Sequence, residues 1–208
     1  IHPEGKDGIN FTPVPVKSAL PDASKTPWPM GDGLSGKPFP KGIDKAKVAA
    51  AVDKAFADPE GLTVAVVVLY KGEIIGEKYA LGANKDTQSE SWSMGKSEMA
   101  TLVGVAMQEG AFKLDDPVPV PDWRRPGDPR GPIKIRDVLN MSSGLAFTHT
   151  STPGYDEVND FSDHFFVHAG GVDAYKYAVA SPVEFPPQVV GRYRNVDPMT
   201  LGFIVRQY

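Results

Sequence analysis

The stretch SWSMGKS, residues 91–97, contains two overlapping patterns of residues that could do chemistry. Gly95-Lys96-Ser97 matches the end of a P-loop, in which backbone amides and a lysine cradle the phosphates of a nucleotide. Ser93 and Lys96 match instead a Ser-x-x-Lys pair, in which the lysine activates the serine as a nucleophile. The two interpretations lead to different classes of protein, a nucleotide-binding module or an acyl-transfer enzyme.

The residues before the stretch disfavour the nucleotide interpretation. A P-loop has its first glycine five residues before the second, at position 90, and that residue is Glu90. A carboxylate there would repel the phosphates that the loop has to bind. The motif should also follow a buried strand, whereas residues 84–90, NKDTQSE, form a polar stretch. The sequence therefore does not favour a nucleotide-binding module.

The Ser-x-x-Lys interpretation is consistent with the residues that follow. If Ser93 begins a helix, Lys96 lies one turn on, so the two side chains share a face at roughly 5–6 Å between Cβ atoms. A serine hydroxyl needs a base to take its proton, and a lysine can be that base where burial lowers its pKa. The free amides of the first helical turn can also stabilise an oxyanion.

Three segments in order, SWSMGKSEMATLVGVAMQEGAFKLDDPV, IKIRDVLNMSSGL and GRYRNVDPMTLGFIV, resemble the serine β-lactamase and penicillin-binding-protein superfamily. They are most similar to its class C β-lactamase-like branch, which includes esterases, D-amino-acid peptidases and 6-aminohexanoate-dimer hydrolase. In that branch the Ser-x-x-Lys helix is followed by a short helix ending in Ser-Gly-Leu and later by a Tyr-x-Asn loop. The resemblance covers about residues 43–208.

The resemblance implies a role for four residues. Ser93 matches the acylated nucleophile and Lys96 its activating partner. Tyr193 matches the tyrosine that shuttles protons to the leaving group, and Asn195 matches the residue that hydrogen-bonds the substrate amide and the lysine. The family's oxyanion hole uses the backbone amide of the nucleophile, here Ser93, and an amide from a late strand.

The chain departs from the family pattern in one respect. The superfamily has a third motif, Lys-Thr-Gly or His-x-Gly, on a strand beside the nucleophile, and neither pattern occurs after Asn195. The resemblance implies an α/β (α+β) β-lactamase/transpeptidase-like fold, an antiparallel sheet flanked by helices plus a helical subdomain. The family's C-terminal strands are expected to be missing from this chain. We therefore expect a second polypeptide to supply those strands and the third motif.

Local patterns predict the elements that must position these residues. Residues 1–42 are rich in Pro and Gly and predict an extended arm that docks through Trp28 and Phe39, with a disordered tail as the alternative. Residues 43–208 form the predicted hydrolase domain. Its first elements are an amphipathic helix over 43–61 and a hairpin over 62–80 that turns at Lys71-Gly72. The first strand is apolar on both faces, which predicts a strand covered on both sides.

The helix that follows Ser93 is predicted to be central and buried, because its apolar residues surround much of its circumference. Gly110 should end it. Residues 133–145 indicate a short helix closed by Ser142-Ser143-Gly144, and residues 197–208 indicate the first turns of another. Residues 146–192 are irregular in pattern apart from a helical piece over 171–181.

Other residues carry weaker patterns. His164 and His168 have the spacing of a zinc-binding pair, but Phe165 stands where the metalloprotease motif needs Glu, so an aromatic-rich cleft wall is the favoured interpretation. Five aromatic residues could shape a pocket or a core and support no site assignment: Tyr155, Phe161, Phe165, Phe166 and Tyr175. We expect neither a metal nor a cofactor.

Composition limits the classes of partner and compartment. The 208 residues carry a net charge of −4 with no long run of either sign, which does not indicate binding to nucleic acid. No stretch is long and apolar enough to predict a membrane span. Cysteine is absent, which excludes disulfides and thiolate catalysis. The leading Ile1 favours a periplasmic or secreted location, with a cytoplasmic one as the alternative.

These observations together predict a serine hydrolase that acts through an acyl-enzyme on a small-molecule ester, amide or β-lactam. The residues do not separate these substrates. The alternative is a penicillin-binding-like relative that is inactive, that acylates without turning over, or that only holds a ligand. Because Ser93, Lys96 and Tyr193 are all present, the sequence favours catalysis over a site that has decayed.

Overall fold

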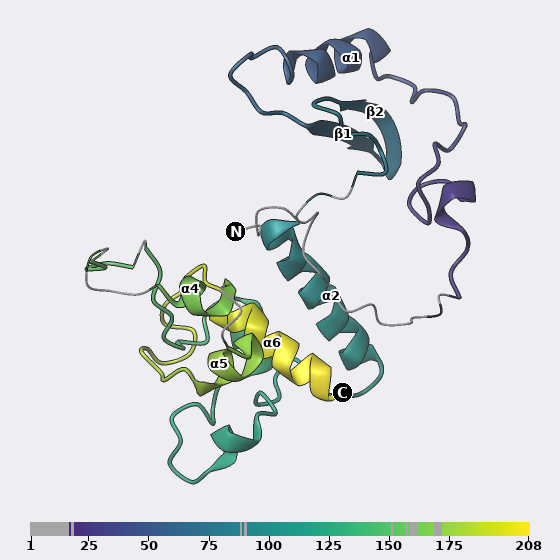
Figure 1. Ribbon diagram of the computed structural model, residues 1–208. Helices are drawn as coiled ribbons and strands as arrows, with labels where there is room; N and C mark the ends of the chain where they lie inside the picture. Colours follow the sequence, from purple (N-terminus) through teal and green to yellow (C-terminus); the bar gives the residue numbers. More distant parts are fainter. Residues whose placement is uncertain are drawn as a thin grey trace. The chain divides into compact units, whose positions relative to one another are not determined.

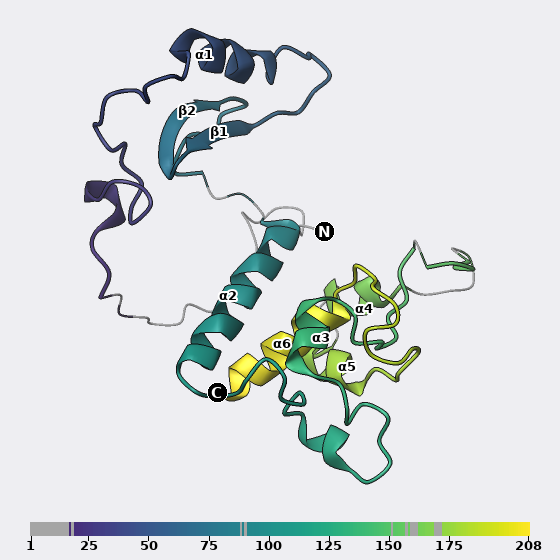
Figure 2. The same ribbon diagram turned by 180° about the vertical axis from the view of Figure 1, so that it is seen from behind.

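The protein divides into two compact units, residues 1–89 and 90–208. The computed structural model (Figures 1 and 2) describes the following residues: Lys17, 19–87, Ser89, 91–150, 152–156, Val158, 162–168 and 172–208. Within these ranges, no helix has both the length and the apolar character needed to cross a bilayer.

The first unit contains one helix and a two-stranded antiparallel sheet. Helix α1 (Lys45–Lys54) begins at Asp44, whose carboxylate accepts hydrogen bonds from the first backbone amides of the helix. Strands β1 (Ala65–Tyr70) and β2 (Glu73–Tyr79) pair across a tight turn in which Lys71 and Gly72 have φ angles of 49° and 79°. Two successive positive φ angles match the twist of a hairpin, so the predicted hairpin turn is present.

The sheet of the first unit is covered on one face only. Along β1 exposed and half-buried residues alternate, and Val67 and Leu69 are 48% and 51% exposed. Helix α1 packs on the sheet, and Val48 and Val52 lie close to the backbone of Gly76 in β2. The prediction that the first strand is covered on both sides is therefore wrong for the described residues, since only α1 packs against this hairpin.

The Pro/Gly-rich segment before α1 is extended apart from a 3-10 turn over Ala23–Lys25. The Lys37 ammonium pairs with the Glu73 carboxylate in β2, and this hydrogen bond lowers the pKa of Glu73. The ammonium of Lys45 lies 5.9 Å from the centre of the Phe39 ring, which is half-buried. Residues 1–16, part of the predicted arm, lie outside the described residues.

The second unit is built around helix α6, which contacts α2, α3 and α5 (Figures 1 and 2). The bounds of its helices are α2 (Gly95–Gln108), α3 (Ile135–Leu139), α4 (Asp163–His168), α5 (Ala174–Ala180) and α6 (Val196–Gln207). The core lies between these helices and the loop over residues 112–123, and its most deeply buried side chains include Val103, Val118, Trp123, Ile133, Ile135, Leu145, Val196, Leu201 and Ile204.

Helix α2 is less buried than its sequence predicts. Val103 and Ala106 face the core, but Leu102 and Val105 are about half exposed. Within the second unit α2 packs on α6 from one side, so the remaining apolar side chains have no packed neighbour there. The predicted end of the helix is correct, because Gly110 follows it with a φ angle of 87°.

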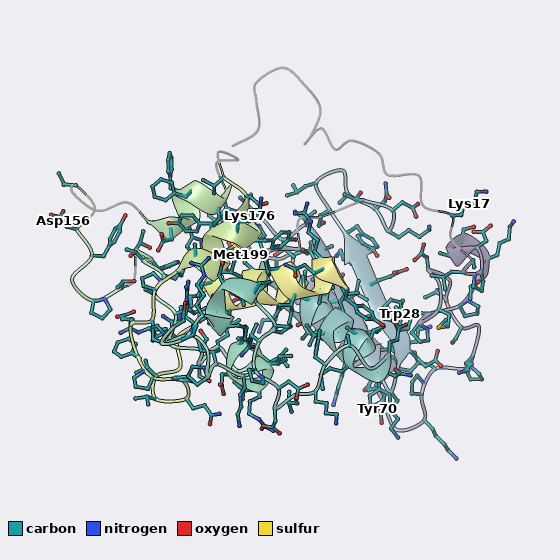
Figure 3. The ribbon with its side chains drawn as sticks, turned by 90° about the horizontal axis from the view of Figure 1, so that it is seen from below. Lys17, Trp28, Tyr70, Asp156, Lys176 and Met199 are labelled. Carbon is teal, nitrogen blue, oxygen red and sulfur yellow. The ribbon has the colours of Figure 1, made fainter. Side chains whose placement is uncertain are left out.

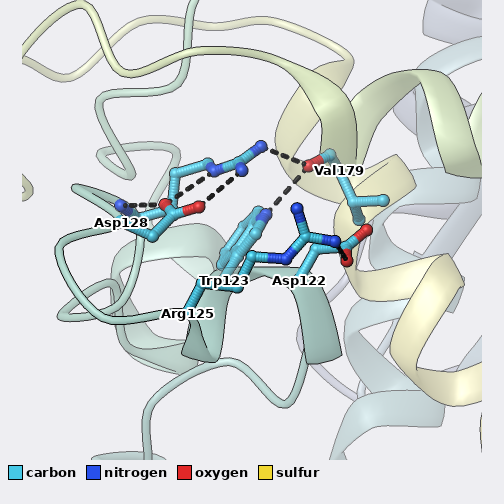
Figure 4. A network of polar contacts seen from close by, with 6 residues as sticks. Asp122, Trp123, Arg125, Asp128 and Val179 are labelled. Atoms are coloured by element: carbon cyan, nitrogen blue, oxygen red, sulfur yellow. Dashed lines mark hydrogen bonds and ion pairs between the residues drawn. The ribbon is translucent and has the colours of Figure 1, made fainter.

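Loops of the second unit are tied to α5 by polar contacts (Figure 4). The indole nitrogen of Trp123 donates to the carbonyl oxygen of Val179 at 2.8 Å, and the Arg130 guanidinium donates to the same oxygen at 3.0 Å. Arg130 also forms a bidentate pair with Asp128, which lowers the pKa of that carboxyl to about 2. These bonds hold the residues before α3 against α5.

The Ser-Gly-Leu turn after α3 is held by backbone bonds that only glycine permits. The carbonyl oxygen of Gly144 accepts from the amides of Glu184 and Phe185 at 2.8 Å and 3.2 Å. Gly144 has a φ angle of 78°, and an ideal Cβ placed on it would collide with the carbonyl oxygen of Phe185. Two features therefore disfavour a side chain at this position: the positive φ angle and the collision with the Phe185 carbonyl oxygen.

We expect Gly144→Ala to destabilise the protein more than Gly110→Ala. Both glycines have a positive φ, which costs an alanine about 1–2 kcal/mol, but no atom lies within 4 Å of a Cβ at Gly110. Gly144→Ala should lower the free energy of unfolding by a further 1–3 kcal/mol or so because of the collision. Urea unfolding of the two variants measures the difference, and equal losses would contradict this account.

Candidate active site

Ser93 and Lys96 lie together at the start of α2. Ser93 is in a 3-10 turn, Trp92–Met94, that runs directly into the helix, and Lys96 is the second helical residue. The Lys96 Nζ lies 2.8 Å from the Ser93 Oγ, which is a hydrogen-bonding distance. The predicted contact between the two side chains is therefore present, because positions three apart share one helical face.

The setting of this pair is more open than predicted. Ser93 is exposed and Lys96 is half-buried, so neither is enclosed in a core. The reason is the one-sided packing of α2 within the second unit. Trp92, just before the nucleophile candidate, has a φ angle of 44°. A non-glycine residue in that region is under backbone strain, which is common beside functional groups.

Tyr193 completes a group of three around Ser93. The Lys96 Nζ lies 4.8 Å from the centre of the Tyr193 ring, close enough for a cation–π contact. A hydrogen bond from the Ser93 hydroxyl lowers the pKa of Tyr193 most; burial opposes it, and Lys96 acts in the same direction as Ser93. The arrangement places a hydroxyl, an amine and a phenol within reach of a single reacting atom.

Asn195 enters the same cavity from the position two residues beyond Tyr193. Its amide nitrogen lies 3.3 Å from the Nδ1 atom of His164 in α4. Tyr193 and Asn195 both line the cavity, as predicted, although Asn195 has helical backbone angles as the N-cap of α6 rather than the extended conformation expected. The sequence predicts His164 in an aromatic-rich cleft wall, and no pattern in it indicates the contact with Asn195.

Arg194, between these two residues, also lines the cavity and lies beside a buried carboxylate. Its side chain is 2% exposed, and its Nε atom lies 3.7 Å from an Oδ atom of Asp197, which is fully buried. Glu184 lies 3.8 Å from the same guanidinium. Burial raises the pKa of Asp197 to about 6, while Ser143 and Arg194 pull it down. Sequence analysis missed this pair, although charges three residues apart in an apolar segment could have indicated it.

A cavity of about 550 Å³ joins the site residues. Its size is within the range of small-molecule pockets in proteins. The residues that line it are Trp92, Ser93, Gly95, Lys96, Met99, His149, His164, Val167, His168, Ala174, Tyr175, Tyr193, Arg194, Asn195, Pro198 and Met199. Met199, on α6, is labelled in Figure 3. No carboxylate is among these lining residues, so the cavity combines apolar walls with basic and hydroxyl groups.

Of the aromatic residues considered in the sequence, Tyr175 lines the cavity. Its ring rests against Gly202 of α6, and a Cβ on that glycine would collide with the ring. Tyr155, Phe165 and Phe166 are not among the lining residues. Phe161 lies outside the described residues, as does Glu90 of the rejected P-loop.

The histidines of the cavity lie close together without forming a metal centre. The ring centres of His164 and His168 are 5.5 Å apart, and those of His149 and His164 are 4.5 Å apart. Across the part of the chain that the structure describes, no three His, Asp or Glu side chains are grouped so as to hold a metal ion. The cavity histidines are thus described by their contacts with one another and with Asn195.

Helix α4, which carries His164, packs Val167 against the core and is also held by hydrogen bonds of Asp163. The Asp163 amide donates to the Thr148 carbonyl at 2.9 Å, while its carboxylate accepts from the Thr148 amide and the Tyr177 hydroxyl. Sequence analysis predicted irregular structure here and missed the helix. The reason is that side-chain hydrogen bonds, which leave no periodic pattern, stabilise this six-residue element.

Comparisons with known proteins agree with this geometry. The family model described as Beta-lactamase matches residues 48–208. No curated protein sequence matches the chain significantly. The match covers the whole of the second unit and residues 48–89 of the first. It includes all four site residues that the sequence singled out, Ser93, Lys96, Tyr193 and Asn195.

Two solved structures show the fold. One is a provisionally named beta-lactamase from Bacteroides dorei DSM 17855, with a TM-score of 0.52 and 23% identity over 77% of this chain and 44% of that one. The other is a provisionally named 6-aminohexanoate-dimer hydrolase from Bacillus anthracis, with a TM-score of 0.55 and 18% identity over 76% of this chain and 42% of that one. The predicted β-lactamase-like fold is confirmed, and the chain spans less than half the length of either structure.

The Asp163–Tyr177 contact predicts how stability depends on alkaline pH. Burial, with help from Asp163, raises the pKa of Tyr177 from 10.0 to about 12. The unfolded chain therefore loses this proton first, and the stability from the contact is full below pH 10 and lost as the pH rises toward 12. We expect unfolding free energies of the native protein and Tyr177→Phe to converge by about 1–2 kcal/mol over that interval. A constant difference would contradict this role.

Proposed function

The chain belongs to the Beta-lactamase family, and from that premise we propose that it is a serine hydrolase with Ser93 as its nucleophile. The observation that supports this most directly is the 2.8 Å contact between the Lys96 amine and the Ser93 hydroxyl at the mouth of the cavity. In this geometry an uncharged amine can accept the hydroxyl proton as the oxygen attacks a carbonyl carbon.

We propose that Tyr193 shares the proton transfers with Lys96. Its pKa is lowered by Ser93 and Lys96, so its phenolate is more accessible than that of a free tyrosine. After attack by Oγ, the tetrahedral intermediate collapses as the leaving oxygen or nitrogen takes a proton from the phenol. A water molecule then attacks the acyl carbon and gives a proton to the Tyr193 phenolate. The Ser93 oxygen leaves with the proton that Lys96 accepted in the first step.

The substrate we propose is a small molecule with an ester, amide or β-lactam bond. Apolar side chains such as Met99, Val167 and Met199 line the cavity and suit an uncharged acyl group. The Asn195 amide supports a polar contact with the carbonyl-bearing part of such a substrate. The backbone amide of Ser93 supports the proposal of an oxyanion site, because it precedes the first turn of α2.

We also propose that a second polypeptide completes the sheet and supplies the third motif. The support is the open apolar face of the β1–β2 hairpin, where Val67 and Leu69 are exposed. An uncovered sheet with free edges is a liability for solubility and stability. Native mass spectrometry of the purified protein should give a species heavier than 22.4 kDa that contains a second chain. A species of that mass alone, or a multiple of it, would contradict the proposal.

Covalent labelling tests the nucleophile. Intact-protein mass spectrometry after treatment with a fluorophosphonate should show one adduct on the native protein and none on Ser93→Ala. Ser97→Ala is the matched control, because Ser97 is exposed in the first turn of the same helix and four residues away. Its adduct should form at the native rate.

In the same assay Tyr193→Phe should slow labelling about 10²- to 10⁴-fold, since the ring remains but the proton carrier is gone. Tyr175→Phe, which removes the hydroxyl of another cavity tyrosine, should label at the native rate. An adduct on Ser93→Ala, or none on the native protein, would overturn the hydrolase. In the second case a ligand-binding relative becomes the better description.

A further inference from the structure

Three of the four histidines in the sequence, His149, His164 and His168, line the cavity beside the proposed nucleophile. Of these, His164 is in the middle, with its ring centre 4.5 Å from that of His149 and 5.5 Å from that of His168. It also packs edge-on against Phe147 at 5.3 Å. The proposed mechanism gives this residue no role, so its placement against Asn195 requires an explanation.

The contact with Asn195 sets the protonation state of the ring. The atom of Asn195 that faces His164 Nδ1, at 3.3 Å, is the amide nitrogen, which can only donate. Nδ1 must therefore accept, and it carries no proton in this arrangement. The Nε2 atom is buried without a hydrogen-bond partner, so it provides no second anchor for the ring.

The groups around His164 keep it uncharged. Burial lowers the pKa of His164 most, and His149, His168 and Lys96 each lower it further. Asp163 acts in the opposite direction but is already engaged by the Thr148 amide and the Tyr177 hydroxyl. The groups that act on the ring thus come from α2 (Lys96), the loop before α4 (His149) and α4 itself (Asp163 and His168).

We propose that His164 is a positioning residue for acylation: its unprotonated Nδ1 fixes the orientation of the Asn195 carboxamide, and uptake of a proton there reverses that orientation and slows the reaction. This inference rests on the proposed function. An Nδ1–H group cannot face an amide NH₂ group, because both are donors, so the carboxamide must turn to present its oxygen. The atom that Asn195 offers to the rest of the cavity then changes from oxygen to nitrogen.

The pH dependence of acylation tests the proposal in His164→Asn and His164→Leu. Asparagine puts a side-chain oxygen near the place of Nδ1, so it can accept from Asn195 but cannot take up a proton. Leucine provides no acceptor. Near pH 8, His164→Asn should label with fluorophosphonate at a rate close to native, and His164→Leu should be slower by about 2- to 10-fold, the worth of one hydrogen bond.

As the pH falls below the lowered pKa of His164, the native rate should fall by an additional factor of about ten for each pH unit, a loss that His164→Asn does not show. Any proton uptake by the Ser93–Lys96 pair affects both proteins and cancels in the comparison. In His168→Asn the loss should remain but begin at a higher pH, because His168 is one of the groups that lower the pKa of His164. Parallel profiles for the native protein and His164→Asn would overturn the proposal.

A second measurement does not depend on activity. The ring of His164 can be titrated by nitrogen NMR in Ser93→Ala protein, where Nδ1 should be the unprotonated nitrogen of the neutral ring. Asn195→Ala removes the donor that favours the neutral form and should raise the pKa of His164. If the pKa of His164 is the same in Asn195→Ala, the contact between the two residues is absent and the proposal is overturned. If the contact holds but native protein forms no adduct with fluorophosphonate, the hydrolase is wrong and the positioning of Asn195 serves a binding site.

Discussion

The buried ion pair between Arg194 and Asp197 is the constraint on which the arrangement of the site depends. Removing two charges from water is costly, and their attraction offsets that cost only where the surrounding structure holds them close. Arg194 therefore cannot turn outward without leaving a carboxylate buried alone. Because Tyr193 and Asn195 are its neighbours in the chain and line the cavity, fixing the arginine limits where the backbone of both residues can lie.

Much of the secondary structure could be predicted from local patterns. The helix at Lys45–Lys54, the hairpin at Lys71-Gly72 and the end of α2 at Gly110 each follow from a short-range signal, namely apolar periodicity or a residue that tolerates positive φ. Whether an element is covered on one face or on both depends on residues far away in the sequence, so local patterns do not predict it. Apolar patterns predicted burial for β1 and α2, and one face of each is exposed in the described structure.

The contacts of the candidate site also include some that local patterns predict and one that they do not. Ser93 and Lys96 could be predicted as partners because one helical turn fixes their separation, and Tyr193 with Asn195 because alternate residues share a side. The contact of Asn195 with His164, 31 residues away, depends on a helix that side-chain bonds to Asp163 hold in place. No periodic pattern encodes such bonds, so both α4 and the histidine's contact were missed.

Gly202 affects the shape of the cavity rather than its reactive groups. The glycine is not among the residues that line the cavity, yet its missing side chain leaves room for the Tyr175 ring that forms part of the cavity wall. A single-base change to a larger residue there would push the aromatic wall and reshape the cavity without touching any group that handles protons. Selection can thus alter which molecules fit while the reactive machinery remains unchanged, from a position that a survey of ligand-contacting residues would overlook.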